Sequence, residues 1–160
     1  MAPTVSRVYS IRVSRRVGAP RPVVYEALVD PTAIAHWRVP DGMSSHVHEF
    51  DARPGGAFRV SLTYDRPTGT GKTSARTDTY SGRFLRLVPG EQVVEELAFE
   101  TADPAMGGTM TLTTTLTDAE DGGTDVVIVH DGIPDAVPAA DNETGTRMAL
   151  TRLAELVEHR

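Results

Sequence analysis

The chain has no cysteine and few aromatic residues, and its basic residues are almost all arginine. The absence of cysteine excludes disulfides, iron–sulfur clusters, thiolate zinc sites and a cysteine nucleophile. Lysine occurs once, at Lys72, and 22 acidic residues outnumber 16 basic ones, which gives a net charge of −6. Nucleic acids and anionic membranes attract concentrated positive charge, so we expect neither as a partner.

Long apolar runs are also missing. No segment approaches the run of about 18 or more apolar residues that crosses a bilayer, and the N-terminus has no apolar run typical of a secretory signal. We therefore expect a cytoplasmic protein without membrane insertion. The length of 160 residues suits one domain over residues 1–160, because domains commonly span about 100 to 200 residues.

The order of strand and helix patterns predicts an α+β fold. A strand pattern at 8–17 is followed by helical spacing over 21–29 and by a second short helix that Asp30 can cap. Six further segments have strand character and are separated by glycine-rich turns: 46–51, 57–64, 78–87, 92–100, 109–117 and 124–131. The ending, 143–158, has the spacing of an amphipathic helix. We expect a β-α-α-β6-α order, with a curved, seven-stranded antiparallel sheet around the C-terminal helix.

Several segments, taken in order, resemble one family. They are Val-Gly-Ala-Pro-Arg-Pro-Val-Val-Tyr-Glu-Ala-Leu-Val-Asp-Pro at 17–31 with Trp37 after it, Asp-Ala-Arg-Pro-Gly-Gly-Ala-Phe-Arg at 51–59, Gly-Arg-Phe-Leu-Arg-Leu-Val-Pro-Gly-Glu at 82–91, and Gly-Gly-Thr at 122–124. This series is similar to the activator-of-Hsp90-ATPase-like (AHSA1-like) group of the START/Bet v 1-like helix-grip superfamily. Members usually have an aromatic residue after the glycine that opens the last helix, whereas Thr146 follows Gly145 here.

The resemblance implies a helix-grip fold, whose internal cavity between sheet and C-terminal helix binds a lipid, a polyketide or another apolar, aromatic-like molecule, without a cofactor. A fold of this kind leaves the function open, because the same scaffold has several uses. Our first hypothesis is a hydrophobic-ligand binding protein that acts as a carrier, a sensor or a stress-related protein. The alternatives are a cavity enzyme of the polyketide cyclase or hydrolase type and a chaperone-regulating interaction module.

The expected cavity walls are inward-facing strand positions together with residues at the end of the grip. The candidate ligand-binding residues are Trp37, His48, Phe58, Val60, Leu62, Tyr64, Tyr80, Met110, Leu112, His130 and Met148. Small residues at Gly82, Ala98, Thr114 and Thr146 would leave space between these walls. Each apolar candidate equally suits an ordinary core position, and Trp37 suits either a cavity lid or an anchor for a short helix.

Four titratable residues are candidates for proton transfer if the protein is an enzyme: His48, Tyr80, Glu96 and His130. Glu95 and Glu96 lie in mid-strand, so one of them faces inward if the strand is regular, and a buried carboxyl group has a raised pKa. His46 and His48 lie on one strand face and could bind a metal together with His130. No acidic fourth ligand is specified, so we expect no metal.

The segment Arg-Pro-Thr-Gly-Thr-Gly-Lys-Thr at 66–73 ends like a nucleotide-binding loop. It begins with arginine in place of glycine, and no amphipathic helix follows, so we expect a hairpin loop. No pattern typical of a catalytic triad or a zinc protease is present in the sequence. An exposed edge strand would allow a homodimer, although no residue marks the partner surface.

Overall fold

The computed structural model describes residues 7–65 and 77–159, which form one antiparallel sheet and three α-helices. The strands are β1 (Val8–Val17), β2 (Met43–Phe50), β3 (Ala57–Tyr64), β4 (Thr77–Val88), β5 (Gln92–Phe99), β6 (Met110–Asp118) and β7 (Thr124–Pro134). The helices are α1 (Arg21–Leu28), α2 (Pro31–Trp37) and α3 (Ala139–Glu158), and a 3-10 turn, Glu120–Gly122, precedes β7. The α+β class and the predicted element order are confirmed. The hairpin loop expected at 66–73 lies outside the described residues.

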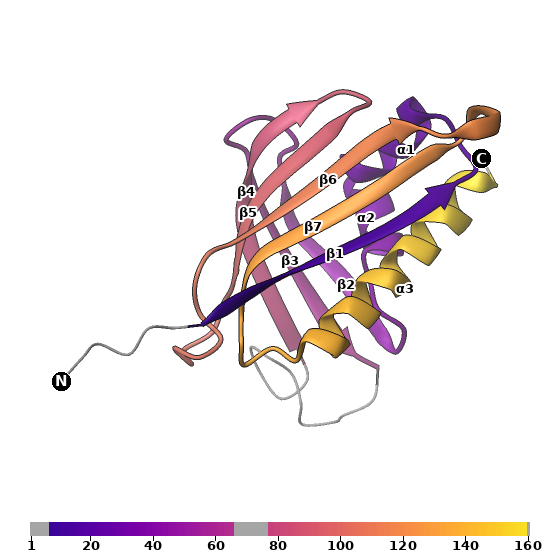
Figure 1. Cartoon of the computed structure of the whole chain (residues 1–160). Helices are drawn as coiled ribbons and strands as arrows, with labels where there is room; N and C mark the ends of the chain where they lie inside the picture. The colour runs from indigo at the N-terminus through magenta and orange to yellow at the C-terminus, as the bar shows by residue number, and fades with distance from the viewer. Residues whose placement is uncertain (1–6, 66–76, 160) are drawn as a thin grey trace.

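The seven strands follow the order β1-β7-β6-β5-β4-β3-β2, and all neighbours are antiparallel. Figure 1 shows this sheet curving around α3, with α1 and α2 together at one end of the grip. The strand register shifts between Tyr9 and Ile11, between Val47 and Glu49, and between Phe84 and Arg86. An extra residue at such a shift bends a strand and increases its twist, which favours a curved sheet.

α3 supplies the inner layer of the core. It buries Ala149, Leu150, Leu153, Ala154 and Val157, which include most of the apolar residues that give the predicted helical spacing. The helix begins at Ala139, directly after Pro138 and four residues before the predicted start. The Asn142 N–H donates to the Pro138 carbonyl over 3.1 Å. The first turn is polar or small, so its helical spacing is not visible in the sequence.

Two contacts fix α2, one at each of its ends. The Asp30 carboxylate accepts a hydrogen bond of 2.9 Å from the Thr32 N–H, which confirms the predicted cap at the start of the helix. At the other end, the indole N–H of Trp37 donates to the Ala27 carbonyl over 2.8 Å and so ties α2 to α1. This bond fixes the position of the end of α2, and with it the position of Arg38, the residue that follows the helix.

Two of the small residues expected to leave cavity space do not do so. A Cβ on Gly82 would lie 1.8 Å from the Glu96 carbonyl oxygen, so the β5 backbone itself occupies the space beside this glycine. Ala98 pairs with Ser81 and lies on the outer face of the sheet, because it alternates with the buried Leu97. Thr114 is buried on the inner face, and Thr146 is half-buried on α3.

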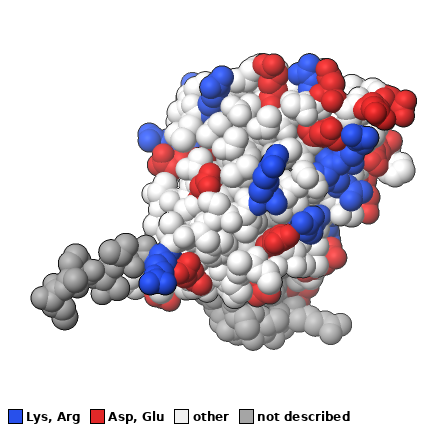
Figure 2. Space-filling view, viewed as in Figure 1, with Lys and Arg blue, Asp and Glu red and all other residues white. Residues whose placement is uncertain are grey.

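The described surface carries charges of both signs. On the face shown in Figure 2, the basic and acidic side chains are interspersed. Ion pairs of the described surface include Arg16–Asp125 and Arg152–Asp41. Three arginines of β1, Arg12, Arg15 and Arg16, line a shallow hollow together with the acidic Asp125. None of the described helices combines the length and the apolar composition that spanning a bilayer requires.

Candidate ligand-binding site

Four polar side chains meet in the interior between the sheet and the helices. Arg38 comes from the end of α2, Tyr80 from β4, Glu95 from β5 and His130 from β7. Tyr80, Glu95 and His130 are 6%, 3% and 9% exposed, and the side chain of Arg38 is 16% exposed. We call these four residues the interior polar cluster.

Strand alternation directs the sheet members of this cluster inward. Glu95 lies between the buried Val93 and Leu97 and shares their face of β5. Glu95 pairs with Leu112 on β6, and Leu112 pairs in turn with His130 on β7. Residues in one cross-strand row point to the same side, and two strand spacings amount to about 10 Å. Glu95 and His130 therefore lie on the same, inner face of the sheet.

Arg38 is the centre of the cluster. Its Nη1 lies 2.7 Å from Oε1 of Glu95, and its guanidinium carbon lies 5.3 Å from the centroid of the Tyr80 ring. Burial opposes the charged form of Arg38, but Glu95 and, to a smaller extent, Tyr80 together more than offset this and raise the pKa of Arg38 above its usual range. The pKa of Tyr80 is raised as well, mainly by burial, so its hydroxyl stays protonated at neutral pH.

His130 is uncharged at neutral pH. Burial and the positive charge of Arg38 lower the pKa of its imidazole to about 4, against the opposing effects of a hydrogen bond with Asn142 and of the charge of Asp131. The cluster thus holds one compensated ion pair and two neutral groups that can form hydrogen bonds.

Two hydrogen-bonding atoms of this cluster lack a protein partner. Within the described part of the chain, the Tyr80 hydroxyl and Nε2 of His130 are buried without a hydrogen bond, as is the hydroxyl of Ser45 on β2. Most buried polar groups in folded proteins are paired, and leaving one unpaired costs about 1 to 3 kcal/mol. Two such atoms beside one buried ion pair are the most unusual feature of this interior, and each is available to a polar group of a ligand.

The apolar candidates on the strands lie on the face that carries the cluster. They are Phe58, Val60, Leu62 and Tyr64 on β3 and Met110 and Leu112 on β6. Phe58, Val60 and Met110 are buried, whereas Leu62, Tyr64 and Leu112 are half-buried. The Phe58 ring makes an edge contact with Tyr80, with 6.1 Å between the ring centroids. The predicted walls are therefore adjacent to the polar cluster.

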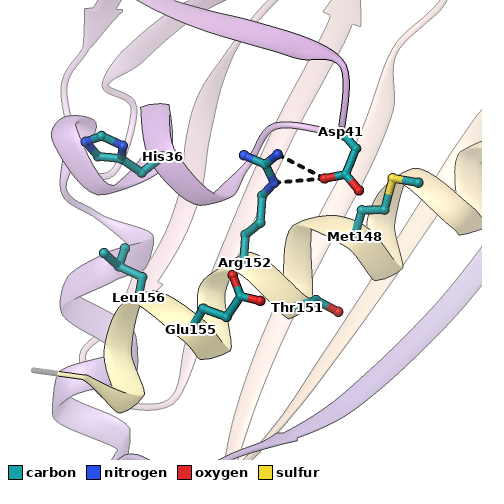
Figure 3. A pocket seen from close by; sticks show the side chains of 7 residues that line it. All are labelled: His36, Asp41, Met148, Thr151, Arg152, Glu155 and Leu156. Atoms are coloured by element: carbon teal, nitrogen blue, oxygen red, sulfur yellow. Dashed lines mark hydrogen bonds and ion pairs between the residues drawn. The ribbon is translucent and has the colours of Figure 1, made fainter.

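Two further candidates lie elsewhere in the fold. Trp37 is 4% exposed and contacts Ala27 through its indole N–H, which is the helix-anchoring arrangement. Met148 lines a hollow of about 800 Å³ between α2 and α3, on the outside of the grip. Figure 3 shows this hollow with the ion pair of Arg152 and Asp41 across it.

His48 and Glu96 face away from the interior. His48 is exposed on β2, where its Nε2 lies 2.8 Å from the Ser61 hydroxyl and its ring stacks edge-on to His46. Glu96 lies on the outer face of β5, 3.6 Å from Arg83, because Glu95 takes the inward position. Neither residue can therefore join Tyr80 and His130 in one site.

The histidines do not come together in the described structure. His46 and His48 lie on the outer face of the sheet, whereas His130 faces the interior. In residues 7–65 and 77–159, no group of three or more histidine, cysteine, aspartate or glutamate side chains is placed to hold a metal ion.

Sequence reasoning missed Arg38 and left the inward carboxylate open between Glu95 and Glu96. The pattern Val93-x-Glu95-x-Leu97 contains the signal for Glu95, since its neighbours at i±2 are core residues. Arg38 has no comparable signal, because its direction depends on where α2 ends.

A curved antiparallel sheet that encloses a long C-terminal helix is the architecture of the helix-grip proteins. Residues 18–158 match the model of the family described as "Activator of Hsp90 ATPase homolog 1-like protein", and the chain belongs to this family. No curated protein matches the chain.

Solved structures of related proteins have the same fold. The crystal structure of protein CV1439 from Chromobacterium violaceum is 38% identical in sequence, with a TM-score of 0.83 over 93% of this chain and 96% of that one. A crystal structure from Rhodobacter sphaeroides (20% identity, TM-score 0.76, 96% and 97% covered) and a solution structure from Arthrobacter aurescens (15% identity, TM-score 0.77, 98% and 94% covered) share the fold alone.

Proposed function

We propose that the protein binds an apolar small molecule between the sheet and α3 and that the interior polar cluster holds a polar group of this ligand. The observation that carries the proposal is the pair of buried, unpaired atoms, the Tyr80 hydroxyl and Nε2 of His130. A ligand that forms hydrogen bonds with both atoms removes an unfavourable feature of the free protein. The AHSA1-like fold is compatible with such a cavity.

The surroundings of the cluster suit the apolar part of the ligand. Leu62, Tyr64 and Leu112 are only half-buried although they lie on the enclosed face, so they retain surface that a ligand would cover. Covering apolar surface is favourable by about 25 cal/mol per Å². A lipid, a polyketide or an aromatic compound has the required composition, and a carrier or sensor role follows from binding without chemistry.

A cavity enzyme is the second candidate, because titratable side chains do meet inside the fold. Tyr80, Glu95 and His130 all contribute to one buried cluster. General acid–base catalysis works best when the pKa of the catalytic group lies near the working pH. Burial moves the pKa of His130 down to about 4 and that of Tyr80 upward, so each moves away from neutrality. Because both pKa values lie away from neutrality, His130 and Tyr80 suit hydrogen bonding to a ligand better than proton transfer.

A neutral apolar dye tests the binding proposal. N-phenyl-1-naphthylamine fluoresces strongly in apolar surroundings, and we expect its emission to rise on addition of the protein. The matched variants are Leu112→Phe, which adds volume on the enclosed face of β6, and Thr113→Phe, which adds similar volume on the opposite face of the same strand. We expect Leu112→Phe to weaken dye binding and Thr113→Phe to leave it unchanged.

Circular dichroism of both variants establishes that they fold. No dye binding by the wild type, or equal binding by the two folded variants, would contradict an interior site. Mass spectrometry of small molecules that co-purify with the native protein identifies the ligand class. The same measurement after prolonged incubation with a bound compound detects any turnover, which the binding proposal does not expect.

A further inference from the structure

The charge balance of the interior polar cluster restricts the kind of polar group that it accepts. Arg38 and Glu95 form an ion pair of 2.7 Å, so the positive charge of the guanidinium already has a buried counter-charge. The Glu95 side chain is 4% exposed, so solvent screens this carboxylate little. A carboxylate on the ligand would be repelled by Glu95, and an ammonium group would be repelled by Arg38. Either charge would also lose its hydration on entering the interior.

The two unpaired atoms favour a group that both donates and accepts. The Tyr80 hydroxyl can act in either direction, and a neutral imidazole offers an N–H or a lone pair at Nε2 according to its tautomer. A hydroxyl group both donates and accepts, so it suits each of these atoms in either tautomer of His130. A carbonyl or an ether oxygen only accepts, so it satisfies both atoms only if each of them donates.

We infer that the cluster recognises an uncharged hydroxyl group on an otherwise apolar molecule, rather than a carboxylate or an amine. This inference rests on the proposed function and specifies the ligand class for the same site. The hydroxyl lies beside Tyr80 and His130, and the apolar part extends along the half-buried Leu62 and Leu112.

Displacement of the neutral dye by compounds with one ten-carbon chain tests the inference. The probes are 1-decanol, decyl methyl ether, decanoate and decylammonium. We expect 1-decanol to bind best. The ratio of its affinity to that of the ether should be about 3 to 10, the usual net value of one hydrogen bond. In Tyr80→Phe, which removes only the hydroxyl, we expect this ratio to fall towards one. Tyr25→Phe, on α1 outside the cluster, should keep the wild-type ratio.

The outcomes separate the two proposals. If the dye binds and 1-decanol and the ether displace it equally well, the hydroxyl inference is overturned and the binding proposal stays intact. The same holds if decanoate or decylammonium displaces the dye best. Failure of the wild type to bind the dye and all four probes overturns both. His130→Leu provides a second variant in which the ratio should fall, and the wild-type series alone already decides the preference among the four head groups.

Discussion

Acid should destabilise the folded protein through His130. The ordinary pKa of its imidazole is 6.5, and burial together with the charge of Arg38 lowers the pKa to about 4 in the folded chain. The unfolded chain therefore takes up a proton at a higher pH than the folded chain does. This contribution to stability is present above about pH 6.5, falls as the pH drops between the two pKa values, and is fully lost below about pH 4.

The size of the effect follows from the gap between the two pKa values. One pKa unit corresponds to about 1.4 kcal/mol, so the full gap amounts to about 3 kcal/mol. Between about pH 7 and pH 5, the part due to His130 is about 2 kcal/mol. Since His130 is only 9% exposed, solvent screening should reduce this figure little.

Urea unfolding of the wild type and of His130→Gln at the two pH values measures this contribution. The variant cannot take up the proton, so its free energy of unfolding should fall by about 2 kcal/mol less than that of the wild type. The comparison cancels the titration of carboxylates common to both proteins. His36→Gln, at an exposed position of α2, should behave like the wild type. Equal losses in the wild type and in His130→Gln would refute the burial argument.

Three substitutions test the packing around the cluster through the free energy of unfolding. Glu95→Gln leaves the charge of Arg38 beside a neutral partner and should destabilise the fold by about 3 kcal/mol. Tyr80→Phe removes a buried, unpaired hydroxyl and should leave stability unchanged or raise it by about 1 kcal/mol. Gly82→Ala places a methyl group 1.8 Å from the Glu96 carbonyl oxygen and should destabilise by about 2 kcal/mol or more.

Each of these variants has a matched control. Glu96→Gln changes the neighbouring carboxylate on the outer face, where we expect an effect within about 0.5 kcal/mol. Tyr9→Phe removes a hydroxyl that donates to the Val137 carbonyl, so it should destabilise by about 1 kcal/mol, opposite in sign to Tyr80→Phe. In Gly107→Ala the nearest atom to the added carbon is the Pro104 carbonyl oxygen at 3.7 Å, an ordinary contact, so this variant should be tolerated. A stability loss in Tyr80→Phe equal to that in Tyr9→Phe would show that the Tyr80 hydroxyl is paired.

The fold was predictable because its signals are local. Alternation along 109–117 defines β6, and the apolar spacing after residue 143 defines most of α3. The start of α3 was not predictable, because the first turn has no apolar spacing. The closure of the β5 backbone on Gly82 was not predictable either, since it depends on how far neighbouring strands bend.

The candidate site was predictable only where strand parity decides the direction of a side chain. Parity places Tyr80 and His130 inside, and it restricts the inward carboxylate to Glu95 or Glu96. The direction of Arg38 depends on the tertiary position of α2, which the Trp37 indole fixes through Ala27. The ion pair that makes the cluster neutral therefore becomes visible only in the folded structure.

The most direct test of the central claim is a titration with 1-decanol. The chemical shifts of the backbone amides of the isotope-labelled protein report where the alcohol binds. We expect the largest changes beside the interior polar cluster, at Tyr80, Glu95 and His130. The hollow between α2 and α3 should show little change, for example at Met148 and Arg152. Changes confined to that outer hollow, or no changes at saturating alcohol, would contradict a ligand site between the sheet and α3.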